Sequence, residues 1–264
     1  MSQLVRMDKV NGLVGGIVFG PVRSRRFGRS LGVNPLPLDR KLCTFNCVYC
    51  ECGLTSQAES RRLAAQPFPS VAEIVEAVRS AIETLRRAGV TVDSLTLTGN
   101  GETTLHPAFE EIVNELLLVH DQHLSDAQIV VLTNGTRLGN PAVHRALERV
   151  EQCVVKMDAG RESTFRQISR PLESVSLEDI AQAASNLPRV IIQTMFIRGR
   201  VDNAGEDEIA EWIERVAAIH PQRVQVYSLD RPAAESGLIA VSRAELEGIA
   251  ALLANRTHLP VDVY

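Results

Sequence analysis

Three cysteines lie within eight residues of one another, in the run Cys43-Thr-Phe-Asn-Cys47-Val-Tyr-Cys50. A [4Fe–4S] cube takes four ligands, one on each iron. Three nearby thiolates bind three corners and leave the fourth iron open to a small molecule. A cluster of this kind suits catalysis better than plain electron transfer. The spacing therefore predicts a catalytic iron–sulfur site at these three residues.

Zinc and disulfide bonds are the alternative interpretations of this run. Structural zinc sites usually pair two cysteine knuckles or add histidines at short spacing, and neither pattern is present. Disulfides need an oxidising compartment, and the chain has five cysteines, an odd number. Cys52 would close the open iron if it were a fourth ligand, so we expect it to be a bystander or to contact the substrate. Cys153 opens an apolar segment, where a thiol is an ordinary small hydrophobe.

Polar residues follow several apolar segments farther along the chain. In Gly99-Asn100-Gly101-Glu102, glycines let the backbone approach a ligand closely and Glu102 supplies a carboxylate, although for this motif alone a simple turn before the next helix is the favoured interpretation. Asn134, which follows Thr133, precedes a glycine, and Asn-Gly is also a common turn signal.

Three further candidate residues lie within later apolar segments or directly after them. Lys156 and Asp158 are two residues apart and face the same side of an extended strand. They could form a buried ion pair, or Lys156 could bind a carboxylate and Asp158 a ribose hydroxyl. Gln193 lies inside an apolar run, where a buried amide needs partners.

Four arginines, at positions 23, 25, 26 and 29, lie within seven residues. They form either a solvated loop with ion pairs or a site for anions, since guanidinium groups suit phosphates and carboxylates. Because they precede the segment that leads into the cysteine run, we expect them near the mouth of the fold. The candidate substrate contacts are Arg23, Arg25, Arg26, Arg198, Tyr227 and Arg231.

The cysteine run with Tyr49 before its last cysteine resembles the signature of the radical S-adenosylmethionine (radical SAM) superfamily. The phrases Gly-Asn-Gly-Glu-Thr-Thr-Leu-His106-Pro and Tyr227-Ser-Leu-Asp-Arg231-Pro extend the resemblance to small members described as iron–sulfur oxidoreductases. Asn100 departs from the usual pattern, because it stands where the first of two adjacent glycines is expected. The resemblance implies that SAM is positioned by Tyr49, Gly99, Asn100, Gly101, Glu102, Thr133, Asn134, Lys156, Asp158 and Gln193.

Strand-like and helical segments alternate along the chain. Extended segments are predicted at Gly16–Phe19, Ser30–Val33, Ser94–Thr98, Gln128–Thr133, Cys153–Met157, Val190–Ile197, Arg223–Ser228 and Val261–Val263. Helices are predicted at Val71–Arg87, Phe109–Val119, Pro141–Val150, Leu177–Asn186, Glu206–Ile219 and Ser242–Ala254. This alternation favours an α/β fold with a parallel sheet. The resemblance implies a partial (β/α)6 barrel, and we expect one domain over residues 1–264 with the segment 1–30 packed on the barrel.

Composition favours a cytoplasmic enzyme. The chain has 264 residues, 45% hydrophobic residues and a formal net charge of −4. No apolar run is long enough to span a bilayer, and the first ten residues lack the apolar region of a signal peptide. The mild acidity and the few aromatic residues do not indicate a nucleic-acid surface.

The resemblance implies that reduction of the cluster cleaves SAM to a 5′-deoxyadenosyl radical, which abstracts hydrogen from a substrate. The electron would come from an external donor of the flavodoxin or ferredoxin type. Glycyl-radical activation and modification of a nucleotide, RNA or peptide are all compatible with the sequence. The alternative from another class is an iron–sulfur electron carrier or cluster carrier without SAM chemistry, which would not need the polar strand ends.

Overall fold

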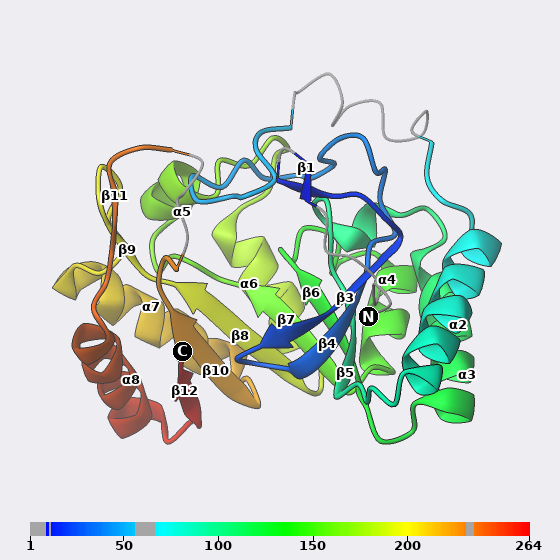
Figure 1. Ribbon diagram of the computed structural model, residues 1–264. Coiled ribbons are helices and arrows are strands. Elements are labelled where there is room, and N and C mark those ends of the chain that lie inside the picture. Colours follow the sequence, from blue (N-terminus) through cyan, green and yellow to red (C-terminus); the bar gives the residue numbers. More distant parts are fainter. Residues whose placement is uncertain (1–8, 11, 56–66, 231–234) are drawn as a thin grey trace. The chain divides into compact units, whose positions relative to one another are not determined.

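The computed structural model describes residues 9–10, 12–55, 67–230 and 235–264 (Figure 1). Contacts divide the chain into two compact units. The first unit comprises Met1–Cys43, Thr55–Thr133 and Gly139–Cys153, and the second comprises Thr44–Leu54, Asn134–Leu138 and Val154–Tyr264. The expected single domain stays a prediction. Among the described residues, no helix is both long and apolar enough to cross a membrane.

The first unit contains a sheet of strands in the order β3 (Val18–Ser24), β4 (Gly28–Val33), β5 (Ser94–Leu97) and β6 (Gln128–Thr133). The β3–β4 pair is an antiparallel hairpin, whereas β4, β5 and β6 are parallel. Three helices, α2 (Val71–Arg87), α3 (Phe109–His123) and α4 (Pro141–Glu148), pack successively against one another. The smaller elements are β1 (Lys9–Val10), β2 (Leu13–Val14) and the 3₁₀ turn η2 (Thr103–Leu105).

Helix α2 shows how the sequence builds this unit. Ser70 and Glu73 form the capping box that their spacing predicts, each side chain bonding the backbone N–H of the other. The residues that recur at helical spacing, Ile74, Val78 and Leu85 among them, are buried. Strand β5 is buried along its whole length, as an apolar strand of a parallel sheet should be.

Strand β7 (Gln152–Lys156) begins in the first unit and ends in the second. From β7 the sheet continues with β8 (Val190–Met195), β10 (Arg223–Tyr227) and β12 (Val261–Val263). The last three strands are parallel. A separate antiparallel pair joins β9 (Ile197–Gly199) to β11 (Leu238–Ala240). Strands and helices thus alternate in both units, which confirms the expected α/β class.

The second unit has four helices among its described residues, α5 (Glu162–Ile168), α6 (Leu177–Ser185), α7 (Glu206–Ile219) and α8 (Arg243–Thr257). Helix α5 has no side-chain cap from its own N-terminal residue. Directly before α5, the N–H groups of Gly160 and Arg161 donate to Glu208, in the first turn of α7, at 2.6 and 3.1 Å. The other Glu208 oxygen accepts from Thr164 Oγ1 at 2.7 Å. The turn after β7 is therefore fixed by a distant helix.

Candidate functional site

The glycine motif after β5 holds the residue that precedes Cys43. The Leu42 N–H donates to the Asn100 carbonyl at 2.8 Å, and the Glu102 N–H donates to the Leu42 carbonyl at 2.9 Å. These bonds join Leu42 to Gly101 as an isolated parallel bridge. A Cβ on Gly101 would lie 1.9 Å from the Leu42 oxygen, and the residue has a φ of +140°. Only glycine meets both conditions, so Gly101 has a structural role in placing this part of the chain.

Gly99 and Asn100, two of the residues expected to bind SAM, make internal contacts in the first unit. The Asn100 side chain is fully buried; its Oδ1 accepts from the Val14 N–H at 2.8 Å, and its Nδ2 donates to the carbonyls of Val14 and Pro37. A Cβ on Gly99 would lie 2.1 Å from Asn34 Oδ1. A SAM contact by either residue remains a prediction, and for Asn100 it would have to come from the backbone.

Glu102 and Thr133, two of the residues expected to bind SAM, are hydrogen-bonded to each other. The buried Glu102 Oε1 accepts hydrogen bonds from Thr133 Oγ1 at 2.7 Å and from Thr104 Oγ1 at 2.6 Å. The Thr104 N–H also donates to Oε1, at 3.2 Å. Thr104 was not predicted as a site residue, although two threonines directly after Glu102 indicate hydroxyl donors for its carboxylate. The carboxylate is thus held in one orientation where β5 and β6 end.

The rest of the cysteine loop is held by contacts inside the second unit. Thr44 is fully buried, and its hydroxyl accepts from Asn134 Nδ2 at 2.8 Å. Backbone hydrogen bonds then run from the loop to the segment 168–172 after α5, with Val48 N–H donating to the Ile168 carbonyl at 3.0 Å. The Cys50 N–H donates to the Cys47 carbonyl at 3.0 Å, which closes a turn with Tyr49 in it. Asn134 therefore positions the loop, a role that its sequence context did not predict.

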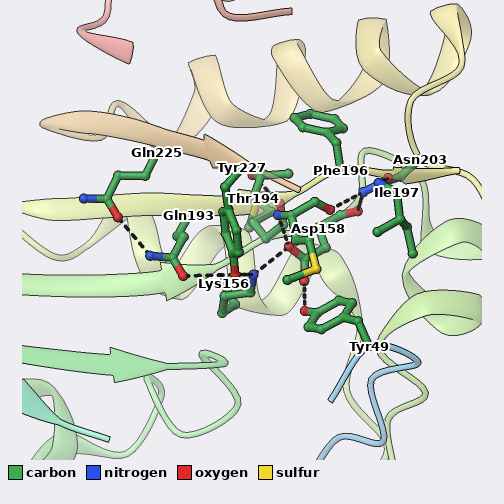
Figure 2. A network of polar contacts seen from close by, with 12 residues as sticks. Tyr49, Lys156, Asp158, Gln193, Thr194, Phe196, Ile197, Asn203, Gln225 and Tyr227 are labelled. Carbon is green, nitrogen blue, oxygen red and sulfur yellow. Dashed lines mark hydrogen bonds and ion pairs between the residues drawn. The ribbon is translucent and has the colours of Figure 1, made fainter. Parts of the chain in front are cut away.

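Lys156 and Asp158 form a buried ion pair where β7 ends (Figure 2). Lys156 Nζ lies 3.0 Å from Asp158 Oδ1, and the two side chains are 20% and 3% exposed. Lys156 Nζ also donates to the Tyr227 hydroxyl at 2.8 Å. The Tyr49 hydroxyl donates to the other Asp158 oxygen. Four residues singled out in the sequence are thus brought together, and one of them lies inside the cysteine run.

The electrostatics of this network favour one set of protonation states. Burial is the largest single influence and works against the charge of Lys156, but Asp158 and Tyr227 together outweigh it and raise the pKa of the ammonium group. The Tyr49 and Tyr227 rings lie near the ammonium, with centroids 5.3 and 4.7 Å from Nζ. Burial, followed by the negative charge of Asp158, raises the pKa of Tyr49 well above its usual value. At neutral pH Lys156 is therefore charged and Tyr49 is a neutral donor.

Gln193 extends this network along the sheet. Its Nε2 donates to Gln225 Oε1 at 2.8 Å, and its Oε1 accepts from the Tyr227 hydroxyl at 3.4 Å. Gln193 and Gln225 are register partners on β8 and β10, and both are buried. Gln225 was missed as a site residue, although its place inside an apolar strand resembles that of Gln193. Asn203 was missed as well; its Nδ2 donates to the Asp158 carbonyl at 2.8 Å.

The arginine-rich segment lies at the β3–β4 hairpin. Arg23 pairs with Arg29 across the two strands, and Arg25 and Arg26 lie in the turn between them. Arg29 binds the Asp93 carboxylate, and Asp93 directly precedes β5. This is the end of the unit where β4 and β5 begin, whereas Glu102 and Thr133 lie where the parallel strands end. The expectation that Arg23, Arg25 and Arg26 lie near the strand exits is therefore corrected, because β3 runs antiparallel to its neighbours.

Two other candidate substrate contacts have different outcomes. Arg198 forms ion pairs with Asp202 at 3.3 Å and Glu245 at 3.2 Å and donates to the Ala204 carbonyl at 3.0 Å. Its guanidinium therefore has structural partners in the second unit. Arg231 lies outside the described residues.

The donor set fits an iron–sulfur cluster. All five cysteines are described and none is in a disulfide; Cys43, Cys47 and Cys50 are half-buried. Burial, followed by the charge of Glu102, raises the pKa of Cys153 to about 12, so this thiol stays protonated and is a poor metal ligand. Among the described residues no group of three or more ligand side chains is gathered as a preformed metal site. The assignment of the three thiolates therefore rests on their chemistry and spacing.

The sequence of this chain matches one family model and is similar to several proteins. Residues 41–216 match the family model described as "Radical SAM superfamily". A UPF0026 protein of Synechocystis sp. is 31% identical over 220 residues, which cover 81% of this chain and 76% of the relative. A UPF0026 protein of Helicobacter pylori is 30% identical, over 82% of this chain and 67% of the relative.

Solved structures show the same fold. A radical SAM methyltransferase from Sphaerobacter thermophilus superposes with a TM-score of 0.67 at 17% identity, covering 89% of this chain and 65% of that protein. Streptococcus suis SuiB bound to S-adenosylmethionine superposes with a TM-score of 0.65 at 11% identity, covering 88% of this chain and 49% of that protein. These likenesses confirm the expected fold, the partial parallel barrel of the radical SAM type. The chain belongs to the radical SAM superfamily and to the UPF0026 family.

Proposed function

We propose that the protein is a radical SAM enzyme in which Cys43, Cys47 and Cys50 hold a [4Fe–4S] cluster with one iron open to SAM. When reduced by an external donor of the flavodoxin or ferredoxin type, the cluster and SAM supply a 5′-deoxyadenosyl radical that abstracts hydrogen from a substrate. Membership of the superfamily supports this chemistry in general. The three cluster ligands and the abstraction of hydrogen from a substrate are proposed for this chain in addition to that general chemistry.

One contact carries the proposal: the Tyr49 hydroxyl donates to Asp158. It links the cysteine run to the end of β7, where Lys156 and Asp158 present a fixed cation and a fixed acceptor. An iron–sulfur carrier without SAM chemistry would not need this buried polar network, which is costly to desolvate unless fully paired. In the first unit, Glu102 supplies a second oriented carboxylate, suited to an amino group.

The substrate stays open, because the structural neighbours differ in what their titles name. One TYW1 structure holds a lysine-pyruvate adduct, and one SuiB structure holds its precursor peptide. Both likenesses are below 20% identity and carry the fold alone. For this chain, modification of a nucleotide, RNA or peptide and glycyl-radical activation all remain candidates.

The proposal predicts specific cluster ligands. Protein reconstituted with iron and sulfide without oxygen should bind about four irons per chain, as one cube requires. Replacement of Cys43, Cys47 or Cys50 by Ala should abolish this binding, because each removes one corner ligand. With dithionite, the wild-type protein should convert SAM slowly to 5′-deoxyadenosine and methionine, measured by chromatography.

Cys52→Ala and Cys153→Ala are the matched controls, and both should keep the cluster and the cleavage of SAM. Loss of iron from Cys52→Ala would show four protein ligands and contradict an open iron. A stable cluster whose paramagnetic spectrum does not change on addition of SAM would favour the electron-carrier alternative.

A further inference from the structure

A cavity of about 580 Å³ lies in the first unit, where helices α2 and α3 end. Its lining includes Val92 and Ala127, which lie just before β5 and β6 begin. The cavity is therefore at the opposite end of these strands from Glu102 and Thr133. Its volume is within the usual range for small-molecule sites, about 300–1,000 Å³. The proposed active site does not account for it.

Part of the cavity lining is aliphatic. We call this part the floor; it consists of Ile82, Leu85, Val90, Val92, Leu124 and Ala127. Ile82, Leu85, Val92 and Ala127 are buried, and the other two are half-buried. No Phe, Tyr or Trp is among the described lining residues, so the cavity offers no such ring on which a nucleobase could stack. This lining suits an aliphatic group.

Arg79 brings a positive charge to the cavity. Its guanidinium contacts Gln122 Oε1 at 3.4 Å and the ring nitrogen His123 Nε2 at 3.3 Å. Both contacts are long for hydrogen bonds. Glu83, one helical turn farther along α2, is bound instead by Arg86 at 2.9 Å and Arg87 at 2.7 Å. Among the described residues, no carboxylate lies within ion-pair distance of Arg79.

The dipole of helix α2 does not account for a cation at position 79. Arg86 and Arg87 lie in the last turn of α2, where cations favour the carbonyl end of the helix dipole. Arg79 lies about two turns earlier and is half-buried. The other carboxylate of the lining, Asp126, is exposed. The guanidinium is thus a charged group beside an apolar cavity that an anionic ligand would complement.

We propose that this cavity binds a small amphiphilic carboxylate, with its aliphatic part on the floor and its carboxylate on Arg79. The proposal concerns binding alone and is independent of the reaction proposed above. It can therefore be tested on the full chain without SAM or substrate, and failure of either proposal leaves the other standing.

The test uses octanoate as the probe, with isothermal titration calorimetry on the full-length protein. The wild-type protein should bind octanoate at one site and should bind octanol, which has no charge, at least tenfold more weakly. Arg79→Gln should weaken octanoate binding at least tenfold, about 1.4 kcal/mol, while changing octanol binding little. Asp126→Asn should strengthen octanoate binding, because it removes a like charge from the rim.

Arg149→Gln is the matched control, since Arg149 lies on the exposed end of α4 and bonds Asn114 outside the cavity. It should bind octanoate as the wild-type protein does. Absence of octanoate binding, equal binding of octanol, or equal losses in the Arg79 and Arg149 variants would each overturn the proposal. Circular dichroism of each variant checks that the fold is retained.

Discussion

Lys156 shows how single residues of the second unit are matched to one another. An ammonium and a carboxylate that are largely withdrawn from water are costly unless each is paired and hydrogen-bonded. Here Asp158 receives the ammonium, the Tyr49 hydroxyl and the Met195 N–H, the last at 2.7 Å. Lys156 in turn donates to Tyr227. The buried ion pair that the sequence offered as its simpler interpretation is confirmed, and its neighbours make it tolerable.

Replacing Lys156 should therefore destabilise the protein strongly. Lys156→Met keeps the length of the side chain but leaves the Asp158 carboxylate buried without its cation, which typically costs about 3–5 kcal/mol. Tyr227→Phe is the matched control, because it removes one hydroxyl and should cost only about 1 kcal/mol. Urea unfolding followed by circular dichroism measures both values. A Lys156→Met protein as stable as Tyr227→Phe would contradict this account of the pair.

The candidate residues and the ends of the strands could be predicted from the sequence, but the hydrogen-bond partners of each side chain could not. Lys156, Asp158 and Gln193 were found because polar residues interrupt apolar runs. The internal role of Asn100 was not found, because its partners Val14 and Pro37 are more than 60 residues away along the chain. A contact of this kind depends on tertiary structure, and no local pattern encodes it.

At the scale of elements, the glycine motif after β5 acts through its backbone. The bridge between Leu42 and Gly101 joins the segment before Cys43 to the end of β5. Because the contact is made by main-chain atoms, rotation of a side chain cannot relieve an added Cβ.

Gly101→Ala should accordingly weaken iron binding after reconstitution, by displacing the chain at Cys43. The new Cβ would meet the Leu42 carbonyl oxygen at 1.9 Å, and the φ of +140° is strained for alanine. Gly139→Ala is the control, because a Cβ at Gly139 meets nothing within 4 Å. Iron content per chain, compared between the two variants, is the measurement. Equal iron content in both would show that the bridge does not position Cys43.

Most elements could be predicted from periodicity and caps, and those that could not were missed for different physical reasons. Gln128–Thr133, Glu206–Ile219 and Val261–Val263 match the predicted bounds. Helix α5 was not predicted, since seven residues give too few turns for a clear pattern. The direction of β3 was not predicted either, because an antiparallel hairpin depends on pairing rather than on local sequence. For this reason Arg23, Arg25 and Arg26 were predicted at the wrong end of the parallel strands.

At the scale of the whole molecule, stability should depend on pH through two buried histidines whose pKa values are shifted in opposite directions. His106 Nε2 bonds the Pro69 carbonyl at 2.9 Å, and its Nδ1 accepts from the Ala108 N–H at 3.0 Å, which requires the neutral ring. Burial lowers its pKa below the usual 6.5. Its contribution is therefore complete above pH 6.5 and is lost as the pH falls through the folded-state pKa.

Replacing His106 should flatten this dependence. In His106→Gln, the free energy of unfolding should fall less between pH 7 and pH 5 than in the wild-type protein. In His120→Gln, the free energy of unfolding should fall more between pH 7 and pH 5 than in the wild-type protein. Burial works against its charge, but the Ala127 carbonyl and Asp121 raise the pKa of His120, so its contribution is lost as the pH rises. Urea titrations at several pH values measure both, and the same slope in all three proteins would exclude these histidines as the cause.

The hydrogen bonds that Glu208 accepts have a consequence for synthesis on the ribosome, which makes the chain from its N-terminus. The N–H groups of Gly160 and Arg161, directly before α5, are translated more than 40 residues before the Glu208 carboxylate that accepts their hydrogen bonds. A nascent chain that stops short of Glu208 therefore contains the whole of α5 but lacks the acceptor for Gly160, Arg161 and Thr164. These three hydrogen bonds can therefore form only after Glu208, in the first turn of α7, has been synthesised.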